Sequence, residues 1–191
     1  MSNSEQQTTL VTSHKGVDLH AASALLVMKD RLEGGELLAD LLRCEVHSFC
    51  GTPDRWDADR LLHTGVYFNP NKHHYGIFTG SALDLDQEQE SASAWLEKVA
   101  GTDLVDHESD AAALANALLG GGVPAGCCSY DVVSYASGQD GPVQSGVLWR
   151  MVIRADEETA QNVGSSLAVA RGRKQGLLIN PHMESWLAVR R

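Results

Sequence analysis

A fourteen-residue segment occurs twice in this chain, and this internal repeat constrains the fold more than any other feature. Residues 65–78 read G-V-Y-F-N-P-N-K-H-H-Y-G-I-F, and residues 176–189 read G-L-L-I-N-P-H-M-E-S-W-L-A-V. The copies align without a gap and share a Gly, three apolar or aromatic residues, and an Asn-Pro pair. Tyr75 falls opposite Trp186 in this alignment. The repeat predicts one supersecondary unit that is used twice.

The second copy belongs to a β-α-β pattern. Apolar residues alternate over 147–153, which is typical of a strand with one apolar face. Asp156 predicts a helix N-cap, because a carboxylate there accepts hydrogen bonds from the first free N–H groups of the helix. The apolar residues that follow at helical spacing are Ala160, Val163, Leu167 and Ala170. We expect the helix to end at Gly172 or Gly176, and residues 186–189 to form the last strand.

The first copy is preceded by similar elements in the same order. Residues 41–49 contain a predicted strand, although the start of this segment would equally suit a helix. Thr52 followed by Pro53 predicts the start of a short helix that runs to about residue 63, with Thr as N-cap and Pro in the first turn. A strand follows near 75–79. Upstream, the periodicity of the apolar segment 21–32 fits either a helix or a strand.

Two tandem β-α-β units predict an α/β (α+β) protein with the ferredoxin-like split βαβ plan, in which the helices cover one face of an antiparallel sheet. We expect a flexible tail followed by one domain made of two units and a long insertion. The expected boundaries are 1–20 for the tail, 21–79 for the first unit with its N-terminal extension, 80–144 for an acidic insertion and 145–191 for the second unit, with 21–191 as the domain. Within the insertion, residues 127–134 could add an edge strand.

The net charge of −10 is concentrated in the predicted insertion. Residues 80–144 contain 11 acidic residues and one basic residue, whereas the two flanking segments together carry equal numbers of each. A segment of this charge argues against nucleic acid as a partner. A solvated acidic surface explains it, and the alternative is a docking face for a basic partner or for the net positive segment 145–191.

Neither the cysteines nor the apolar segments indicate export or a membrane. The four cysteines form no disulfide framework, and no apolar stretch approaches the roughly 18–20 residues that cross a bilayer. The first residues lack the basic and apolar regions of a secretory signal. We therefore expect a cytoplasmic protein with reduced thiols and no membrane contact.

The C-terminal unit resembles the second half of PurS, the small subunit of bacterial phosphoribosylformylglycinamidine synthase. The matching residues are Asp156-Glu157-Glu158, Leu177-Leu178-Ile179-Asn180-Pro181, Glu184 and Trp186. Typical members are far smaller, and both the acidic insertion and the additional Asn-Pro copy depart from the family pattern. The resemblance implies a ferredoxin-like fold and self-association through sheet edges. It also implies a non-catalytic role in a purine-synthesis complex, with synthetase or glutamine amidotransferase subunits as partners.

The Asn-Pro loops hold the densest polar groups, and they supply most of the candidate ligand or partner contacts. These candidates are Asn69, Lys72, His73, His74, Tyr75, Arg150, Asn180, His182 and Glu184. A lysine or arginine could bind an anion, and a histidine could transfer a proton. The competing interpretation is that both loops are plain turns with polar side chains in water, where the Asn holds the bend by bonding to its own backbone.

No motif predicts a metal, a cofactor or a catalytic residue. Paired cysteine knuckles, phosphate-binding glycine loops and nucleophile elbows are all missing from the sequence. The leading hypothesis is a non-catalytic, PurS-like assembly subunit that self-associates and bridges partner proteins. The alternatives are a regulatory module that binds a small molecule between the two β-α-β units, with Lys72, His73, His182 and Arg150 as contacts, and an enzyme that uses His73 or His74 as acid or base.

Overall fold

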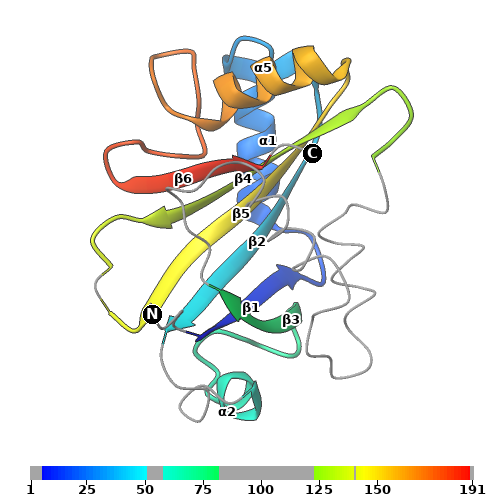
Figure 1. Ribbon diagram of the computed structural model, residues 1–191. Coiled ribbons are helices and arrows are strands. Elements are labelled where there is room, and N and C mark those ends of the chain that lie inside the picture. The colour runs from blue at the N-terminus through cyan, green and yellow to red at the C-terminus, as the bar shows by residue number, and fades with distance from the viewer. Residues whose placement is uncertain (1–5, 51–57, 82–122, 140, 190–191) are drawn as a thin grey trace.

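The computed structural model of the protein describes residues 6–50, 58–81, 123–139 and 141–189. A six-stranded antiparallel sheet runs through the molecule in the order β3-β1-β2-β5-β4-β6 (Figure 1). Its strands are β1 (Gln6–His14), β2 (Leu38–Cys50), β3 (His73–Ser81), β4 (Cys128–Ala136), β5 (Val143–Ile153) and β6 (Glu184–Val189). The helices are α1 (Leu19–Arg31), α2 (Ala58–His63) and α5 (Glu157–Ala168), with a short 3-10 helix η1 (Gly35–Leu37). Among the described residues, no helix has the length and apolar character that would let it span a membrane.

Each half of the sheet is a split β-α-β unit. In the first half, β2 and β3 run in the same direction and β1 lies between them. In the second half, β5 and β6 run in the same direction and β4 lies between them. The predicted α+β class and antiparallel sheet are confirmed. The four-stranded ferredoxin-like plan is not confirmed. Each half has three strands, its middle strand precedes the other two in the sequence, and the two halves lie side by side in one six-stranded sheet.

The strand registers relate the two halves by a pseudo-twofold axis. One row of paired residues crosses the whole sheet in the order Tyr75, Thr12, Glu45, Val147, Ser134 and Trp186. The two ends of this row, Tyr75 and Trp186, are the residues that the sequence repeat aligns. Counting inward from both ends makes Glu45 and Val147 equivalent, and these two residues pair with each other. The axis therefore passes through the Glu45–Val147 pair.

The repeated segment has the same backbone structure in both halves. Gly65 and Gly176 have positive φ angles of 67° and 71°, the left-handed conformation that glycine adopts at little cost. In each copy the carbonyl oxygen of the Asn accepts hydrogen bonds from the N–H groups three and four residues later. The side-chain oxygen of Asn69 or Asn180 accepts a further bond from the N–H two residues later. The Asn thus holds each bend, as the turn interpretation predicted.

The prediction of a flexible tail over residues 1–20 is wrong, because residues 6–14 form β1, the middle strand of the first half. Leu10 and Val11 are fully buried there. The segment reads as polar because it is rich in threonine, yet Thr8, Thr9 and Thr12 are buried too. Threonine is β-branched and favours strands, and tertiary pairing with two neighbours outweighs the polar composition.

The boundaries of the predicted insertion are also wrong. β4 and the start of β5 fall inside residues 80–144, and β4 lies between β5 and β6 rather than at an edge. The acidic stretch at 84–110 lies outside the described residues, as do Thr52 and Pro53.

The structure decides between helix and strand for one segment and shows where a second predicted helix begins and ends. The ambiguous segment 21–32 is helical as far as Arg31 and belongs to α1, whose N-cap Asp18 accepts hydrogen bonds from the N–H groups of His20 and Ala21. Asp156 caps α5 as predicted. The helix ends at Ala168, before Gly172, because Val169 pairs with Ile179.

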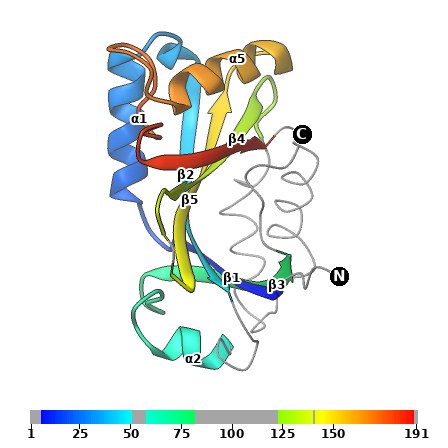
Figure 2. The same ribbon diagram turned by 60° about the vertical axis from the view of Figure 1, so that its left-hand side comes forward.

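The helices cover one face of the sheet (Figure 2). Among the described residues, two separate apolar cores lie on this face. The larger core lies under α1 and α5 and includes Met28, Leu41, Tyr130, Trp149, Met151 and Leu167. The smaller core lies under α2 and consists of Leu10, Phe49, Leu61, Phe68 and Ile77. Equivalent positions of the repeat enter the two cores, Phe68 the smaller one and Ile179 the larger one.

Candidate ligand groove

A polar groove of about 320 Å³ lies on the helix-bearing face of the sheet, between the two apolar cores. Its polar side chains come from four strands and are Arg43, Glu45, His47, Ser134, Ser145 and Glu184. Glu45 and Val147 both line it, so the groove lies on the pseudo-twofold axis. We call these residues the axial groove.

The position of the groove follows from strand periodicity. Side chains at alternate positions of a strand share a face, so Leu41, Arg43, Glu45, His47 and Phe49 all point toward the helices. Leu41 enters the larger core and Phe49 the smaller one, while the three polar residues between them lie where the cores separate.

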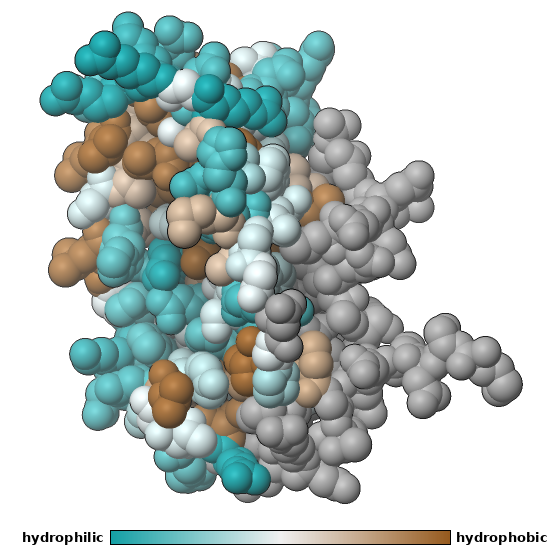
Figure 3. Space-filling model, turned by 90° about the vertical axis from the view of Figure 1, so that its left-hand side faces the viewer, coloured by the Kyte–Doolittle hydropathy of each residue, from teal (hydrophilic) through white to brown (hydrophobic). Residues whose placement is uncertain are grey.

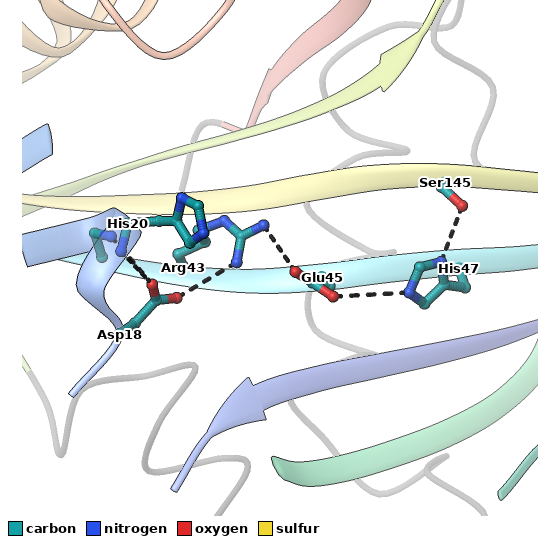
Figure 4. Close-up of polar contacts among 7 residues, drawn as sticks. Asp18, His20, Arg43, Glu45, His47 and Ser145 are labelled. Atoms are coloured by element: carbon teal, nitrogen blue, oxygen red, sulfur yellow. Dashed lines mark hydrogen bonds and ion pairs between the residues drawn. The ribbon is translucent and has the colours of Figure 1, made fainter. Parts of the chain in front are cut away.

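Arg43 anchors a chain of polar contacts along β2 (Figure 4). Its Nη2 lies 2.9 Å from Oε1 of Glu45, and its Nη1 lies 3.4 Å from Oδ2 of Asp18. The guanidinium carbon also lies 5.8 Å from the ring centroid of Trp149. Two carboxylates therefore balance the single positive charge of Arg43, which leaves the groove with excess negative charge.

His47 continues the chain toward β5 (Figure 4). Its Nδ1 lies 3.0 Å from Oγ of Ser145, and its Nε2 lies 4.0 Å from Oε2 of Glu45. Burial lowers the pKa of His47, and the nearby carboxylate of Glu45 opposes this effect only in part. The imidazole is neutral at neutral pH, so it has one hydrogen-bond donor and one acceptor.

Glu184 joins the groove to the second Asn-Pro loop. Its Oε1 accepts a hydrogen bond of 2.9 Å from Oγ of Ser134, and its Oε2 accepts one of 2.8 Å from the N–H of Asn180. In the first loop, the equivalent residue His73 accepts a longer bond of 3.4 Å from the N–H of Asn69. Burial and the neighbouring His14 lower the pKa of His73.

Of the predicted contacts in the loops, only Glu184 lines the axial groove. Asn69 and Asn180 hold the turns, and Lys72 and His182 are exposed. Tyr75 packs on Phe68, with ring centroids 4.7 Å apart. His73 and His74 begin β3, at one edge of the sheet, and the second loop leads into β6 at the other.

Arg150, another predicted contact, does not line the axial groove. Its side chain points to the opposite face of the sheet and is buried, with 3% of the residue exposed. Nε and Nη2 donate hydrogen bonds of 2.6 and 2.8 Å to the two carboxylate oxygens of Asp131 on β4. This buried, bidentate ion pair links β4 to β5 on the face opposite the axial groove.

Apart from Glu184, the polar residues that line the groove are not among the predicted contacts. The alternation Arg43, Glu45, His47 between Leu41 and Phe49 was visible in the sequence. Three polar residues on the core-facing side of a strand are the signal that could have identified the site.

The described residues include no group of three or more side chains that could hold a metal ion. None of the four cysteines forms a disulfide bond. Burial raises the pKa of Cys44 to about 12, so its reactive thiolate form is suppressed near neutral pH.

No family model, no curated protein and no solved structure matches this chain.

Proposed function

We propose that the protein binds a small polar molecule in the axial groove. The observation that carries this proposal is the convergence of six polar side chains from four strands on the core-facing side of the sheet. Side chains at such positions normally pack beneath helices, and polar groups there lower stability unless they are paired or used. A concave site with a few converging polar groups is the usual form of a small-molecule site.

The charges of the groove favour a ligand that donates hydrogen bonds. Arg43 is already engaged by Asp18 and Glu45, while the carboxylates of Glu45 and Glu184 both face the groove. His47 and Ser145 add neutral groups that can accept or donate. We infer a ligand with hydroxyl or amino groups. Of the hypotheses drawn from the sequence, this is the small-molecule module, located between the two units but with different contacts.

A thermal-shift screen of small hydroxyl- and amine-bearing metabolites tests the proposal. A ligand present at 100 times its dissociation constant should stabilise the fold by about 2.7 kcal/mol, a shift of several degrees. Glu45→Gln and Ser145→Ala should each reduce the shift, while Glu33→Gln, an exposed carboxylate outside the groove, should not. A full screen without a shift, or equal shifts in all three variants, would contradict the proposal.

A non-catalytic assembly role of the PurS type is a second proposal, and one observation favours it. The two Asn-Pro loops have the same backbone hydrogen bonds and lead into the two edge strands, so the opposite edges of the sheet have a similar backbone arrangement. Such edges can bridge two partner proteins or two further copies of the chain. A pull-down analysed by mass spectrometry and light scattering should then recover a synthetase or glutamine amidotransferase subunit. Recovery of the protein alone as a monomer would contradict this role.

A further inference from the structure

The axial groove has a carboxylate on each side, one from each half of the sheet. Glu45 lies on β2 in the first half, and Glu184 begins β6 in the second half. Glu45 and Ser134 belong to the same row of paired residues and are two strand spacings apart, which is about 10 Å between their backbones. The carboxylate of Glu184 accepts a hydrogen bond of 2.9 Å from Ser134. The two carboxylates therefore lie on the two sides of β5.

Both carboxylates can accept a further hydrogen bond from a molecule in the groove. Oε1 of Glu45 is bonded to Arg43, but Oε2 lies 4.0 Å from Nε2 of His47, which is beyond hydrogen-bond distance. The side chain of Glu45 is 37% exposed, so a ligand can reach it. Each oxygen of Glu184 accepts one hydrogen bond, and a carboxylate oxygen has two lone pairs.

The charges around the groove leave a negative excess. Among the described residues, Asp18, Glu45 and Glu184 carry three negative charges, and Arg43 carries one positive charge. His47 is neutral at neutral pH, because burial lowers its pKa. The difference, three minus one, is two negative charges. A ligand with two positive charges would balance them, whereas a neutral ligand would leave them without counter-charges in a groove that is partly shielded from water.

The surface between the two carboxylates is small and apolar. Val147 on β5 occupies the position between Glu45 and Ser134 in the row of paired residues. Ala136 and Gly146 also line the groove. The side chains of these lining residues offer no hydrogen-bonding group, so a hydrocarbon chain can lie on them without leaving a polar side chain unpaired. A short hydrocarbon linker between two charged ends fits this arrangement.

The exposed apolar surface of the molecule lies outside the groove. In Figure 3, hydrophobic residues gather on the side of the molecule that carries α1. Leu19 and Leu26 on this helix are 73% and 69% exposed, and neither lines the groove. The groove therefore selects its ligand by charge and hydrogen bonding more than by apolar contact.

We propose that the ligand of the axial groove is a short linear aliphatic diamine, with one ammonium group bonded to Glu45 and the other to Glu184. This inference rests on the small-molecule function proposed above and names the class of the ligand. Hydrogen bonds between an ammonium and a carboxylate are stronger than those between neutral groups. Ser134, Ser145 and His47 also line the groove and can accept the remaining ammonium hydrogens.

Calorimetric titration at pH 7 with three matched probes tests the proposal. The probes are 1,4-diaminobutane, n-butylamine and 1,4-butanediol, which have the same carbon chain and carry two, one and no positive charges. The diamine should bind one-to-one. The monoamine and the diol should each bind at least about tenfold more weakly, because they lack one or both of the charge-assisted hydrogen bonds.

Three carboxylate variants locate the two ammonium groups. Glu45→Gln and Glu184→Gln should each weaken diamine binding by about tenfold or more. Glu33→Gln removes the same charge at an exposed position outside the groove and should change the affinity by less than about twofold, because salt screens distant charges. Glutamine keeps an oxygen that can accept the hydrogen bond from Ser134, and circular dichroism checks that each variant is folded.

The outcomes distinguish this inference from the proposed function. A diol that binds as tightly as the diamine would overturn the diamine class but leave a small-molecule site in place. So would a diamine affinity that Glu45→Gln or Glu184→Gln changes no more than Glu33→Gln does. If the diamine fails to bind while another compound of the thermal-shift screen does, the diamine class is again wrong. If no compound of that screen binds, the site itself is contradicted.

Discussion

The two halves of the sheet share one backbone plan but differ in the side chains that they bury. Three residues along each strand from the row of pairs that contains Glu45 and Val147, the two halves have equivalent pairs. The first half pairs Thr9 with Ser48, and the second half pairs Asp131 with Arg150. All four residues are at most 3% exposed. One half therefore buries two hydroxyls where the other buries an ion pair.

The same divergence occurs at the axis itself, where Glu45 faces its counterpart Val147. Hydrogen bonding of the backbone preserves the registers regardless of these substitutions, since the ladder involves only main-chain groups. The comparison teaches that the repeat accounts for the frame, while the groove arises where the two halves no longer match.

The largest contrast should come from the buried pairs. Asp131→Ala should destabilise the protein by about 3–5 kcal/mol, because it leaves the Arg150 charge buried without its partner. Thr9→Ala, at the equivalent position of the first half, should lower the free energy of unfolding by only about 1 kcal/mol. Urea unfolding monitored by circular dichroism measures both. The double variant Asp131→Leu/Arg150→Met should be more stable than Asp131→Ala, and equal losses at Thr9 and Asp131 would remove the contrast.

Substitution of the two repeated glycines should give the next largest difference in stability. At Gly65 a Cβ would meet no atom within 4 Å, so Gly65→Ala should lose only the conformational term of about 1–2 kcal/mol. At Gly176 a Cβ would overlap the carbonyl oxygen of Val169. Gly176→Ala should therefore lose clearly more, which the shift in the urea midpoint would show. Similar midpoints for the two variants would mean that the second loop relaxes freely.

The residues that close the two Asn-Pro loops allow a finer comparison. Glu184→Ala removes two short hydrogen bonds and leaves the buried Ser134 hydroxyl without its acceptor, so a loss of about 1.5–3 kcal/mol is expected. His73→Ala removes one bond of 3.4 Å and should lose less than about 1 kcal/mol. Thermal unfolding at pH 7 measures this difference. A larger loss for His73→Ala would show that the first loop depends on contacts other than this bond.

The smallest expected effect is a dependence of stability on pH that comes from His47, a residue of the groove in the first half. Burial lowers the pKa of His47 from 6.5, so the unfolded chain binds more protons between that value and the lower folded pKa. Stability should fall as the pH falls through this window and then level off with respect to His47. His47→Gln should flatten the stability curve between pH 7 and pH 5 relative to wild type. An unchanged slope would mean that Glu45 compensates for burial.

Several local features followed from short-range rules. Asp156 was predicted as an N-cap from its position before two glutamates and an apolar stripe, and the Asn-Pro turns were predicted from Asn and Pro chemistry. The strand 147–153 was identified by its alternation. The site was harder to predict from the sequence. Ser134 and Ser145 look like ordinary strand serines, and only strand pairing brings them beside Glu184 and His47.

By itself, the sequence determined that one unit is used twice, with its glycine, its Asn-Pro bend and the strand that follows. These features depend on the conformational preferences of a few neighbouring residues, which act wherever the segment lies. Only the tertiary structure decided that residues 6–14 and 128–136 are middle strands, that the halves join at Glu45 and Val147, and that the groove lies between two cores. Those outcomes depend on pairing between segments far apart in the chain, where hydrogen bonding and burial outweigh local composition.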